Sequence, residues 1–435
     1  MTSDGNRASS GITAISVRGF KSLYDETRIE IRPLTILAGS NSSGKSSIMQ
    51  PLLLLKQTLE APFDPGPLLL DGPNVSFTAL DQILSRAIRG KTVDGFEIGL
   101  EGGPRASLCE RLVRTPDGKF EISEMVTDDG TLRIPLRESM GDNEIRSTFP
   151  PQTVGGAGTW TVERARCFLA CRLLAPSGGL SVLYDGARPF TLLLRGLIHV
   201  PAIRSGRARS HPVSATGPEF EGRFHDYFAS VLEQWQAASD PRLAELASDV
   251  RHLDLTSAVQ TRRLNDAQIE VLVDRLPTSA KSTRRDMISI ADMGSGVSEV
   301  LPILVALLAA QPGQLVYLEE PEANLHPRAQ SALADVLADA AKRGVHVVAE
   351  THSSLLLLEI MTLVAEGKLS PDLVKLYWFS RDKRGATKVT PGELDEAGRY
   401  GDWPQDFEIV ELHADNRYLN ASGEVLWKQQ ALSGE

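Results

Sequence analysis

The first 60 residues show a strand pattern that ends at a glycine-rich turn. In the segments ITAISVRGF and TRIEIRPLTILA, polar and apolar positions alternate until the last strand becomes wholly apolar. An apolar run bounded by a turn is typical of a buried strand, and this one leads directly into Gly39. The next segment, SIMQPLLLLKQTLE, has the length and composition of a helix, although Pro51 is expected to kink it. The pattern therefore predicts a strand, a glycine loop and a helix in succession.

The pattern changes after residue 60. Asp-Gly pairs at 117–118 and 129–130 separate strand-like runs, and such pairs are typical of hairpin turns. We therefore expect an antiparallel sheet in this part of the chain. The stretch 137–160 is rich in polar residues, Gly and Pro, which predicts a long loop.

Helical periodicity follows near residues 162–174 and 224–250. From residue 284, strands and helices alternate through RRDMISIAD, VSEVLPILVALLAAQ, QLVYLEE, HPRAQSALADVLADAAKRG and VHVVAETHS. Such alternation predicts a parallel sheet flanked by helices. We therefore predict an α/β fold with a mixed or parallel sheet, an antiparallel β subdomain and a large inserted region of strands and helices. The expected parts are residues 1–60, the insertion 61–283, and residues 284–435.

Composition narrows the class of protein. The formal net charge of −10 argues against a protein that coats nucleic acid through its average field, although a local basic groove stays possible. No run approaches the roughly 18 apolar residues needed to span a bilayer, and the start MTSDGNRASS lacks the plan of a signal peptide, so we expect a cytoplasmic protein without a membrane partner. Cys109, Cys167 and Cys171 do not have the spacing of a disulfide framework or a zinc site. Cys167 and Cys171 are expected to be buried thiols on one helix face.

The segment GSNSSGKS, residues 39–46, predicts a phosphate-binding loop. Gly39 and Gly44 free the backbone to wrap phosphates, while N–H groups at the start of the helix form an anion nest. Lys45 would reach the β- and γ-phosphates and Ser46 would bind Mg²⁺. A simple glycine turn before a helix is the alternative, and the flanking strand and helix argue against it. The predicted nucleotide-binding residues of this loop are Gly39, Ser40, Asn41, Ser42, Ser43, Gly44, Lys45, Ser46 and Ser47.

Two carboxylates follow the apolar strand of LVYLEEPE. They stand at the carboxyl end of a strand, where open α/β sheets bind ligands. Glu319 would hold Mg²⁺, and Glu320 would act as the general base that orients or deprotonates water. An acidic turn after a core strand explains the same residues if no phosphate loop accompanies them.

Two further segments carry candidate site residues. His352 follows an apolar strand in VVAETHSS, so its imidazole would reach the γ-phosphate as a third catalytic residue beside Lys45 and Glu320. Ser295, Gly296 and Ser298 of MGSGVSE open a helix, whose free N–H groups suit a phosphate. Taken singly, a structural histidine and a plain helix cap are the alternatives.

In chain order, GSNSSGKSS, MGSGVSE, YLEEPEANLHP and ETHS resemble the Walker A, signature, Walker B with D-loop, and switch-histidine motifs of ABC-type ATPase heads. Within that class the chain resembles the AAA-type ATPases related to SMC proteins and OLD-family ATPases, which often occur in prokaryotic phage-defence modules. FKSL near Phe20 and NLHP with Pro327 fit that group, as do DGPNVSFTALDQIL, HVPAIRSGRARSHP and GRYGDWPQDF. The resemblance implies an ABC-type P-loop head with ATP and Mg²⁺ as cofactors.

The resemblance also implies a composite site. Two heads would dimerise head to tail, so that Ser295, Gly296 and Ser298 of one copy close over ATP held by the Gly39 loop of the other. Hydrolysis at Glu320 would then release the dimer. Such closure is a ligand-driven shift between open and closed states, which a switch or clamp needs.

The sequence departs from the motif pattern at several positions. Glu319 stands where an aspartate is usual, Glu299 replaces the signature glutamine, and residues 324–326 differ from the transporter D-loop. Slow hydrolysis is therefore expected. The candidates for a Q-loop residue are Gln50, Gln57 and Gln82. No Toprim-like acidic cluster or HNH pattern follows the last strand, so nuclease activity would have to come from a partner.

The leading functional hypothesis is an ATPase switch or clamp that regulates a separate nuclease or toxin in anti-phage defence, as a homodimer or higher homo-oligomer. Alternatives are an SMC-like DNA repair or maintenance ATPase, a transporter subunit and a small-molecule P-loop kinase. The region between the two halves is not heptad-patterned as long SMC arms would be. DNA binding is possible at two basic clusters, each of which is otherwise a solvated face: Arg204, Arg207, Arg209 and His211, and Lys281, Arg284 and Arg285.

Overall fold

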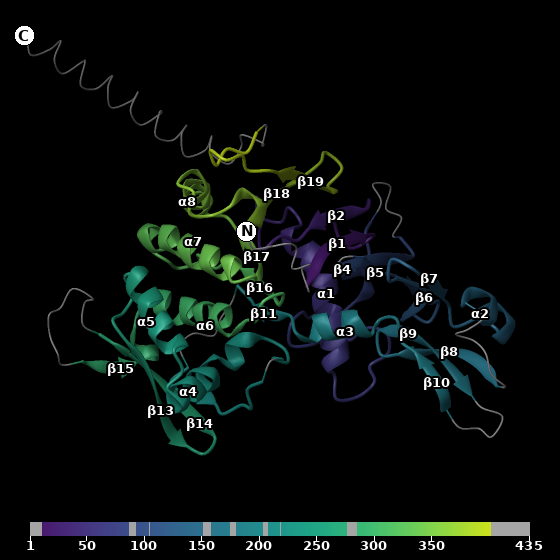
Figure 1. The fold of residues 1–435 in the computed structure, drawn as a ribbon, viewed down its shortest axis with the longest axis horizontal. Coiled ribbons are helices and arrows are strands. Elements are labelled where there is room, and N and C mark those ends of the chain that lie inside the picture. The colour runs from purple at the N-terminus through teal and green to yellow at the C-terminus, as the bar shows by residue number, and fades with distance from the viewer. Residues whose placement is uncertain are drawn as a thin grey trace, which may run out of the picture.

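A computed structural model describes residues 11–86, 93–103, 105–150, 158–174, 180–202, 208–217, 219–275 and 285–401. Within these ranges the chain forms four sheets, with helices packed on both faces of the central one (Figure 1). The helices are α1 (Lys45–Glu60), α2 (Asp142–Thr148), α3 (Arg188–Arg195), α4 (Phe228–Ala238), α5 (Arg242–His252), α6 (Ser295–Ala309), α7 (Pro327–Lys342) and α8 (Ser354–Ala365). Short 3₁₀ turns are η1 (Leu80–Gln82), η2 (Phe224–Asp226), η3 (Ile290–Asp292) and η4 (Pro371–Leu373).

The central sheet carries the predicted motifs. Its strands, in spatial order, are β11 (Ile198–Val200), β16 (Leu315–Glu319), β17 (His346–Thr351), β3 (Leu34–Gly39), β18 (Val374–Arg381) and β19 (Thr387–Gly392). The first five are parallel, and β19 pairs antiparallel with β18. Because the carboxyl ends of parallel strands meet at one edge, this order brings three motif-bearing loops together.

The register of β17 determines which side chains meet at that edge. Glu319 of β16 pairs with Glu350 of β17, and Thr351 of β17 pairs with Ala38 of β3. The strand that precedes His352 therefore lies between the strand of the glycine loop and the strand of the paired carboxylates.

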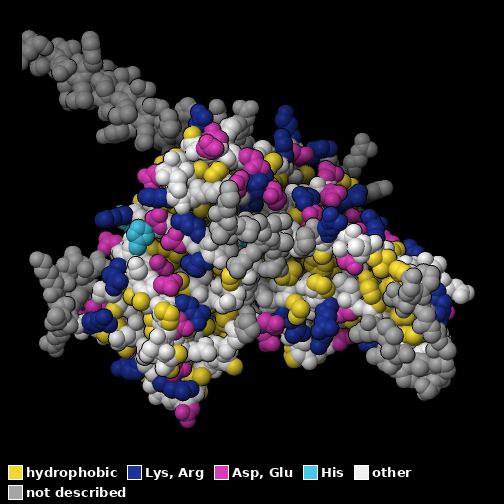
Figure 2. Space-filling model, in the orientation of Figure 1, with side chains coloured by type: hydrophobic (Ala, Val, Ile, Leu, Met, Phe, Trp, Pro, Cys, Tyr) yellow, Lys and Arg dark blue, Asp and Glu magenta, His cyan; other side chains and the backbone are white. Residues whose placement is uncertain are grey.

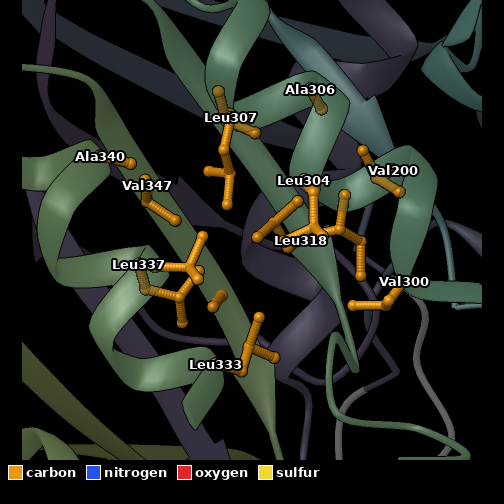
Figure 3. Packing of buried hydrophobic residues seen from close by; sticks show 14 of the residues in the cluster. Val200, Val300, Leu304, Ala306, Leu307, Leu318, Leu333, Leu337, Ala340 and Val347 are labelled. Carbon is orange, nitrogen blue, oxygen red and sulfur yellow. The ribbon is translucent and has the colours of Figure 1, made fainter. Parts of the chain in front are cut away.

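Alternation along these strands divides the core into two layers. Leu318 of β16 and Val347 of β17 face α6 and α7, where they meet Leu304, Leu307, Leu333 and Leu337 (Figure 3). Tyr317 and Val348 point to the opposite face, which α1 covers. Because side chains of a strand alternate between faces, the same alternation directs Glu319 and Glu350 toward the side of α1. The P-loop helix and the signature helix α6 therefore pack on opposite faces of the central sheet.

The predicted antiparallel sheet is present and has strands from both sides of residue 60. It consists of β2 (Thr27–Glu30), β1 (Ile12–Arg18), β4 (Gly95–Gly102), β5 (Ala106–Arg114), β6 (Phe120–Asp128) and β7 (Arg133–Leu136), in that spatial order. The hairpins at the two Asp-Gly pairs are confirmed, and Gly118 and Gly130 supply the positive φ that their turns require.

Two expectations for the following segment are wrong. The expected loop 137–160 contains α2, and the expected helix over 162–174 is a hairpin of β8 (Thr159–Ala165) and β9 (Phe168–Leu174), to which β10 (Leu180–Tyr184) adds a third strand. Apolar FLACRLL fills a strand buried on both sides, so its continuous hydrophobicity does not distinguish strand from helix. Cys167 and Cys171 are buried as expected, but they lie in the hairpin turn and in β9 rather than on a helix.

The helical pattern near 224–250 is confirmed as α4 and α5. Helix α4 lies against a small sheet of β12 (His211–Pro212), β14 (Gln268–Asp274), β13 (Val259–Asn265) and β15 (Met287–Ser289), and α5 packs against α4, α6 and α7. Among the described residues, no helix has both the length and the apolar character to cross a bilayer.

Candidate nucleotide site

The glycine loop between β3 and α1 requires glycine at both ends. Gly39 has φ +148°, and a Cβ there would lie 2.2 Å from the carbonyl oxygen of Phe379. Gly44 has φ +104°, and a Cβ there would lie 2.2 Å from Thr387 Oγ1. Neither position can hold a side chain without movement of β18 or β19. The loop is therefore fitted against the last strands of the sheet.

The seven other residues predicted for this loop differ in exposure. Ser40, Asn41 and Ser42 are exposed, Ser46 is partly exposed, and Ser43, Lys45 and Ser47 are buried. Ser43 Oγ is buried and has no hydrogen-bond partner, which is unusual for a buried hydroxyl. An unpaired donor in a loop of this geometry fits an oxygen-rich ligand such as a phosphate.

Lys45 folds back over the loop. Its Nζ donates to the carbonyl oxygens of Gly39 and Ser40 at 3.0 and 3.1 Å and lies 3.0 Å from His352 Nε2. Burial lowers the pKa of His352, and the adjacent Lys45 charge lowers it further. The neutral imidazole therefore accepts a hydrogen bond from the ammonium group. In this arrangement the lysine charge is held at the mouth of the loop, where phosphates would bind.

The two consecutive carboxylates point to different surroundings. Glu320 is partly exposed, lies 3.7 Å from His352 Nε2 through its Oε1 and has a positive φ of 45°. A non-glycine residue in this conformation is uncommon and is often found at functional sites. Glu319 is held on the β11 side of the sheet: its Oε1 lies 3.2 Å from His199 Nε2, and its Oε2 accepts from the N–H of Ala202 at 3.0 Å. The two carboxylates at the end of β16 therefore contact different residues.

Glu350 is the carboxylate in contact with the loop serine, and the sequence reasoning missed it. Ser46 Oγ donates to Glu350 Oε2 at 2.8 Å, and the Tyr317 hydroxyl donates to Glu350 Oε1. Burial raises the pKa of Glu350 to about 7, against the opposing effect of these two hydrogen bonds. The available signal was a single charged residue at the end of the apolar strand VHVVAET.

Glu322 is a second carboxylate that sequence reasoning did not single out. Its Oε1 accepts from Thr351 Oγ1 at 2.6 Å and from the N–H of His352 at 2.8 Å. Glu322 is 6% exposed. It therefore fixes the backbone that carries His352 to the turn after β16.

The signature residues lie at the start of α6, on the other face of the sheet. Ser298 Oγ donates to the carbonyl oxygen of Ser295 at 3.0 Å, and Gly296 packs near the backbone of Asn324. Residue Gly294, which caps this helix, is exposed. Lys45, Ser46, Glu320 and His352 thus meet in one site. Ser295, Gly296 and the buried Ser298 instead open α6 on the other side of the sheet.

Comparison with known families and structures finds matches in two parts of the chain and a similar fold. The family described as "AAA ATPase domain" matches residues 11–120, and the family described as "AAA domain, putative AbiEii toxin, Type IV TA system" matches residues 206–359. The crystal structure of the SmcHead bound to the C-winged helix domain of ScpA superposes with a TM-score of 0.52 at 13% identity, over 89% of this chain and 99% of that one. Both matching families are described as AAA domains, and the chain has the fold of an ABC-type ATPase head.

Another solved structure gives a weaker superposition. The SMC head domain from Thermotoga maritima has a TM-score of 0.42 at 14% identity, over 88% of the ATPase chain and 99% of its own. Comparison with curated proteins finds no match.

The three glutamines considered for a Q-loop have structural contacts. Gln50 accepts from Lys21 Nζ at 2.6 Å, and Gln82 accepts from the N–H of Thr78 at 2.8 Å. Gln57 is buried and binds the backbone of residues 69–75 through both side-chain atoms. In the part of the chain that the structure describes, none of these hydrogen bonds is made to the glycine loop.

A cleft of about 570 Å³ adjoins the glycine loop of the ATPase. Arg381 in its wall donates from Nε to the carbonyl oxygen of Ser42 at 2.7 Å, and Thr387 Oγ1 donates to the carbonyl oxygen of Ser43 at 2.8 Å. Lys21 and the exposed Tyr24 line the same cleft. The cleft is large enough for a nucleoside and opens beside the phosphate loop.

The basic clusters are only partly described. Arg204, Arg207, Lys281 and Arg284 lie outside the described residues, and Arg285 is exposed. Arg209 forms an ion pair with Asp292, with its Nη1 3.0 Å from Asp292 Oδ2. On the face shown in Figure 2, Lys and Arg side chains are interspersed with Asp and Glu. The described part of these clusters therefore shows a paired arginine rather than a continuous basic stripe.

Proposed function

We propose that the ATPase binds ATP with Mg²⁺ on the Gly39 loop and hydrolyses it, and that ATP joins two copies head to tail. The observation that carries this proposal is the convergence of Lys45, Ser46, Glu320 and His352 at one edge of the sheet. Hydroxyl and carboxylate oxygens beside the loop are the donors that Mg²⁺ prefers, so the site fits the metal. Bound there, Mg²⁺ would neutralise phosphate charge.

The residues have distinct roles in this proposal. The loop N–H groups and Lys45 bind the phosphates, and Arg381 and Tyr24 line the cleft that takes the nucleoside. Glu320 orients and deprotonates water, because its carboxylate is partly exposed at the strand end. His352 positions Lys45 and faces the γ-phosphate.

Head-to-tail dimerisation is supported by the separation of the two surfaces. The start of α6 lies on the opposite face of the sheet from α1, so within one copy the signature residues do not cover the glycine loop. A second copy would bring Ser295, Gly296 and Ser298 to the nucleotide. Closure of this kind would make the ATPase a switch.

A matched pair of glycines tests the dimer. Gly294 caps α6 and Gly141 caps α2; both have ordinary negative φ, and a Cβ at either would meet nothing within 4 Å. Both can therefore accept arginine without strain in the fold. In a Glu320→Gln background, which retains ATP, we expect ATP to produce dimers or larger assemblies by light scattering. Gly294→Arg should prevent assembly while ATP binding persists, and Gly141→Arg should not.

We propose regulation of a separate effector, a nuclease or toxin, in anti-phage defence as the biological role. It is supported by the description of one matching family, which names a putative toxin of a type IV system. In a phage challenge, Lys45→Ala should abolish protection by the intact module. Protection that survives this substitution would reject an ATP-driven role.

An SMC-like role in DNA maintenance is the second candidate. The observation that favours it is the shared head fold with a structure in which the SmcHead binds a winged-helix domain of ScpA. Salt-dependent DNA binding by the ATPase, strengthened by ATP in the Glu320→Gln variant, would support this role over defence signalling.

A further inference from the structure

The P-loop serine and Glu350 have the spacing of two ligands on one metal ion. Ser46 Oγ and Glu350 Oε2 are 2.8 Å apart. In an octahedral Mg²⁺ site with oxygen ligands at 2.0–2.1 Å, neighbouring ligands lie about 2.9 Å apart. The pair therefore matches one edge of such a site.

The fold holds the Glu350 carboxylate in this orientation. Glu350 is 4% exposed on β17, the strand next to β3 of the glycine loop. Its other oxygen, Oε1, accepts from the buried Tyr317 hydroxyl on β16. Because Tyr317 engages one oxygen, the other is left facing Ser46.

Glu319 is held by β11 and the residues that follow this strand. Both of its oxygens have partners on the β11 side of the sheet, His199 Nε2 and the N–H of Ala202. The His199 ring stacks on Tyr317, with centroids 5.3 Å apart and planes at 11°, and its Nδ1 lies 3.0 Å from Asn74 Oδ1. Glu319 thus connects the strand end to His199 and, through it, to the loop that contains Asn74.

We propose that Glu350 is the protein carboxylate that binds Mg²⁺ together with Ser46, and that Glu319 is a positioning residue held by His199. This inference rests on the proposed binding of ATP with Mg²⁺. The acidic metal ligand would then lie on β17, the strand that precedes His352, and not on β16, the strand that leads to the paired carboxylates. Asn74 and His199 then support the site from outside the motif-bearing loops, because His199 links Glu319 to Asn74.

The test compares Glu350→Gln with Glu319→Gln in a magnesium titration. A fluorescent ATP analogue reports binding, first in EDTA and then with increasing Mg²⁺. We expect Glu350→Gln to raise the Mg²⁺ concentration for half-maximal enhancement at least about tenfold, while binding in EDTA stays within about twofold of the wild type. Glu319→Gln should shift that concentration less than about threefold. Glu121→Gln, at an exposed carboxylate on β6 of the antiparallel sheet, is the control and should leave the titration unchanged.

Each other outcome has a defined meaning. A large shift in Glu319→Gln, with or without one in Glu350→Gln, would overturn the assignment. If Glu350→Gln does not fold, Glu350→Asp keeps the charge but withdraws it from Ser46: a weakened Mg²⁺ response supports the proposal, and a wild-type response rejects it. Absence of analogue binding to the wild type would instead reject the proposed function itself. Electron paramagnetic resonance of Mn²⁺ gives a readout independent of hydrolysis.

Discussion

Gly39 shows how one residue links the backbone to the site. Its φ of +148° is strained for other residues, and a Cβ there would collide with the Phe379 carbonyl at 2.2 Å. We expect Gly39→Ala to lower the free energy of unfolding by about 2 kcal/mol and to remove ATP binding, because the loop must move off β18. Chemical denaturation and equilibrium binding measure the two effects.

Gly66 is the control for this substitution. It also has a positive φ, +92°, but a Cβ there meets nothing within 4 Å. Gly66→Ala should therefore show the backbone penalty alone, about 1 kcal/mol, with ATP binding intact. Equal effects of the two substitutions on binding would show that the contact with Phe379 does not matter.

Glu322 gives a second prediction for a single side chain. Its Oε1 accepts two hydrogen bonds, from Thr351 Oγ1 and from the N–H of His352. Glu322→Ala leaves both donors unpaired in a buried place and should lower the free energy of unfolding by about 3 kcal/mol in urea. Glu322→Gln keeps an acceptor and should cost less. If both variants lose the same stability, the charge rather than the hydrogen-bond geometry is important.

Residue patterns identified part of the site. The motif positions Lys45, Ser46, Glu320 and His352 lie together because each lies in, or just after, the loop that follows an apolar strand of one parallel sheet. Contacts that depend on the order of strands in the sheet could not be predicted from these patterns. Glu350 faces Ser46 only because β17 lies between β3 and β16, and no local pattern contains that order.

Among the helices and strands, those with a clear local hydrophobic pattern were predicted, and those that depend on long-range pairing were not. Helix α7 was predicted because its apolar positions recur with the helical period, and α6 because its long apolar run exceeds the length of a strand. The β8–β9 hairpin was mistaken for a helix because its second strand is buried on both faces and lacks alternation. β11 was not predicted at all: it has three residues and is defined by its pairing with β16.

Packing of α5 near α7 predicts a pH effect on stability. Burial raises the pKa of Asp249 on α5 to about 6, although Arg343 opposes the shift. The folded state therefore binds the proton more tightly than the unfolded chain, whose carboxyl titrates near 3.8. The stabilising contribution is complete below that value and is lost as pH rises toward 6.

Replacing Asp249 by Asn removes this titration. Asp249→Asn should gain stability over the wild type as pH rises from 4 to 7, by about 1–2 kcal/mol once the partial exposure of the carboxylate is considered. Denaturation midpoints at several pH values measure the difference in stability between the variant and the wild type. A difference that stays constant across this range would contradict the raised pKa of Asp249.

The proposed nucleotide site brings together residues from distant parts of the sequence. Ser22 near the start, Ser43 of the loop and Thr387 near the end of the described chain form one hydrogen-bonded group, with Thr387 Oγ1 donating to the Ser43 carbonyl oxygen and contacting Ser22 Oγ. The central sheet likewise combines β3 with strands more than 150 residues away in sequence. A ligand on the loop is thus bound by early and late parts of the chain at once.

Nucleotide should therefore stabilise the entire chain. At a concentration 100 times its Kd, a ligand that binds only the folded state adds about 2.7 kcal/mol to the free energy of unfolding. We expect ATP with Mg²⁺ to raise the unfolding temperature of Glu320→Gln, with a further rise as protein concentration increases, because assembly adds to binding. Gly294→Arg in this background should keep the first rise and lose the dependence on protein concentration, and Lys45→Ala should lose both. If Gly294→Arg also removes the first rise, the start of α6 contributes to the site within a single copy, and the head-to-tail arrangement is wrong.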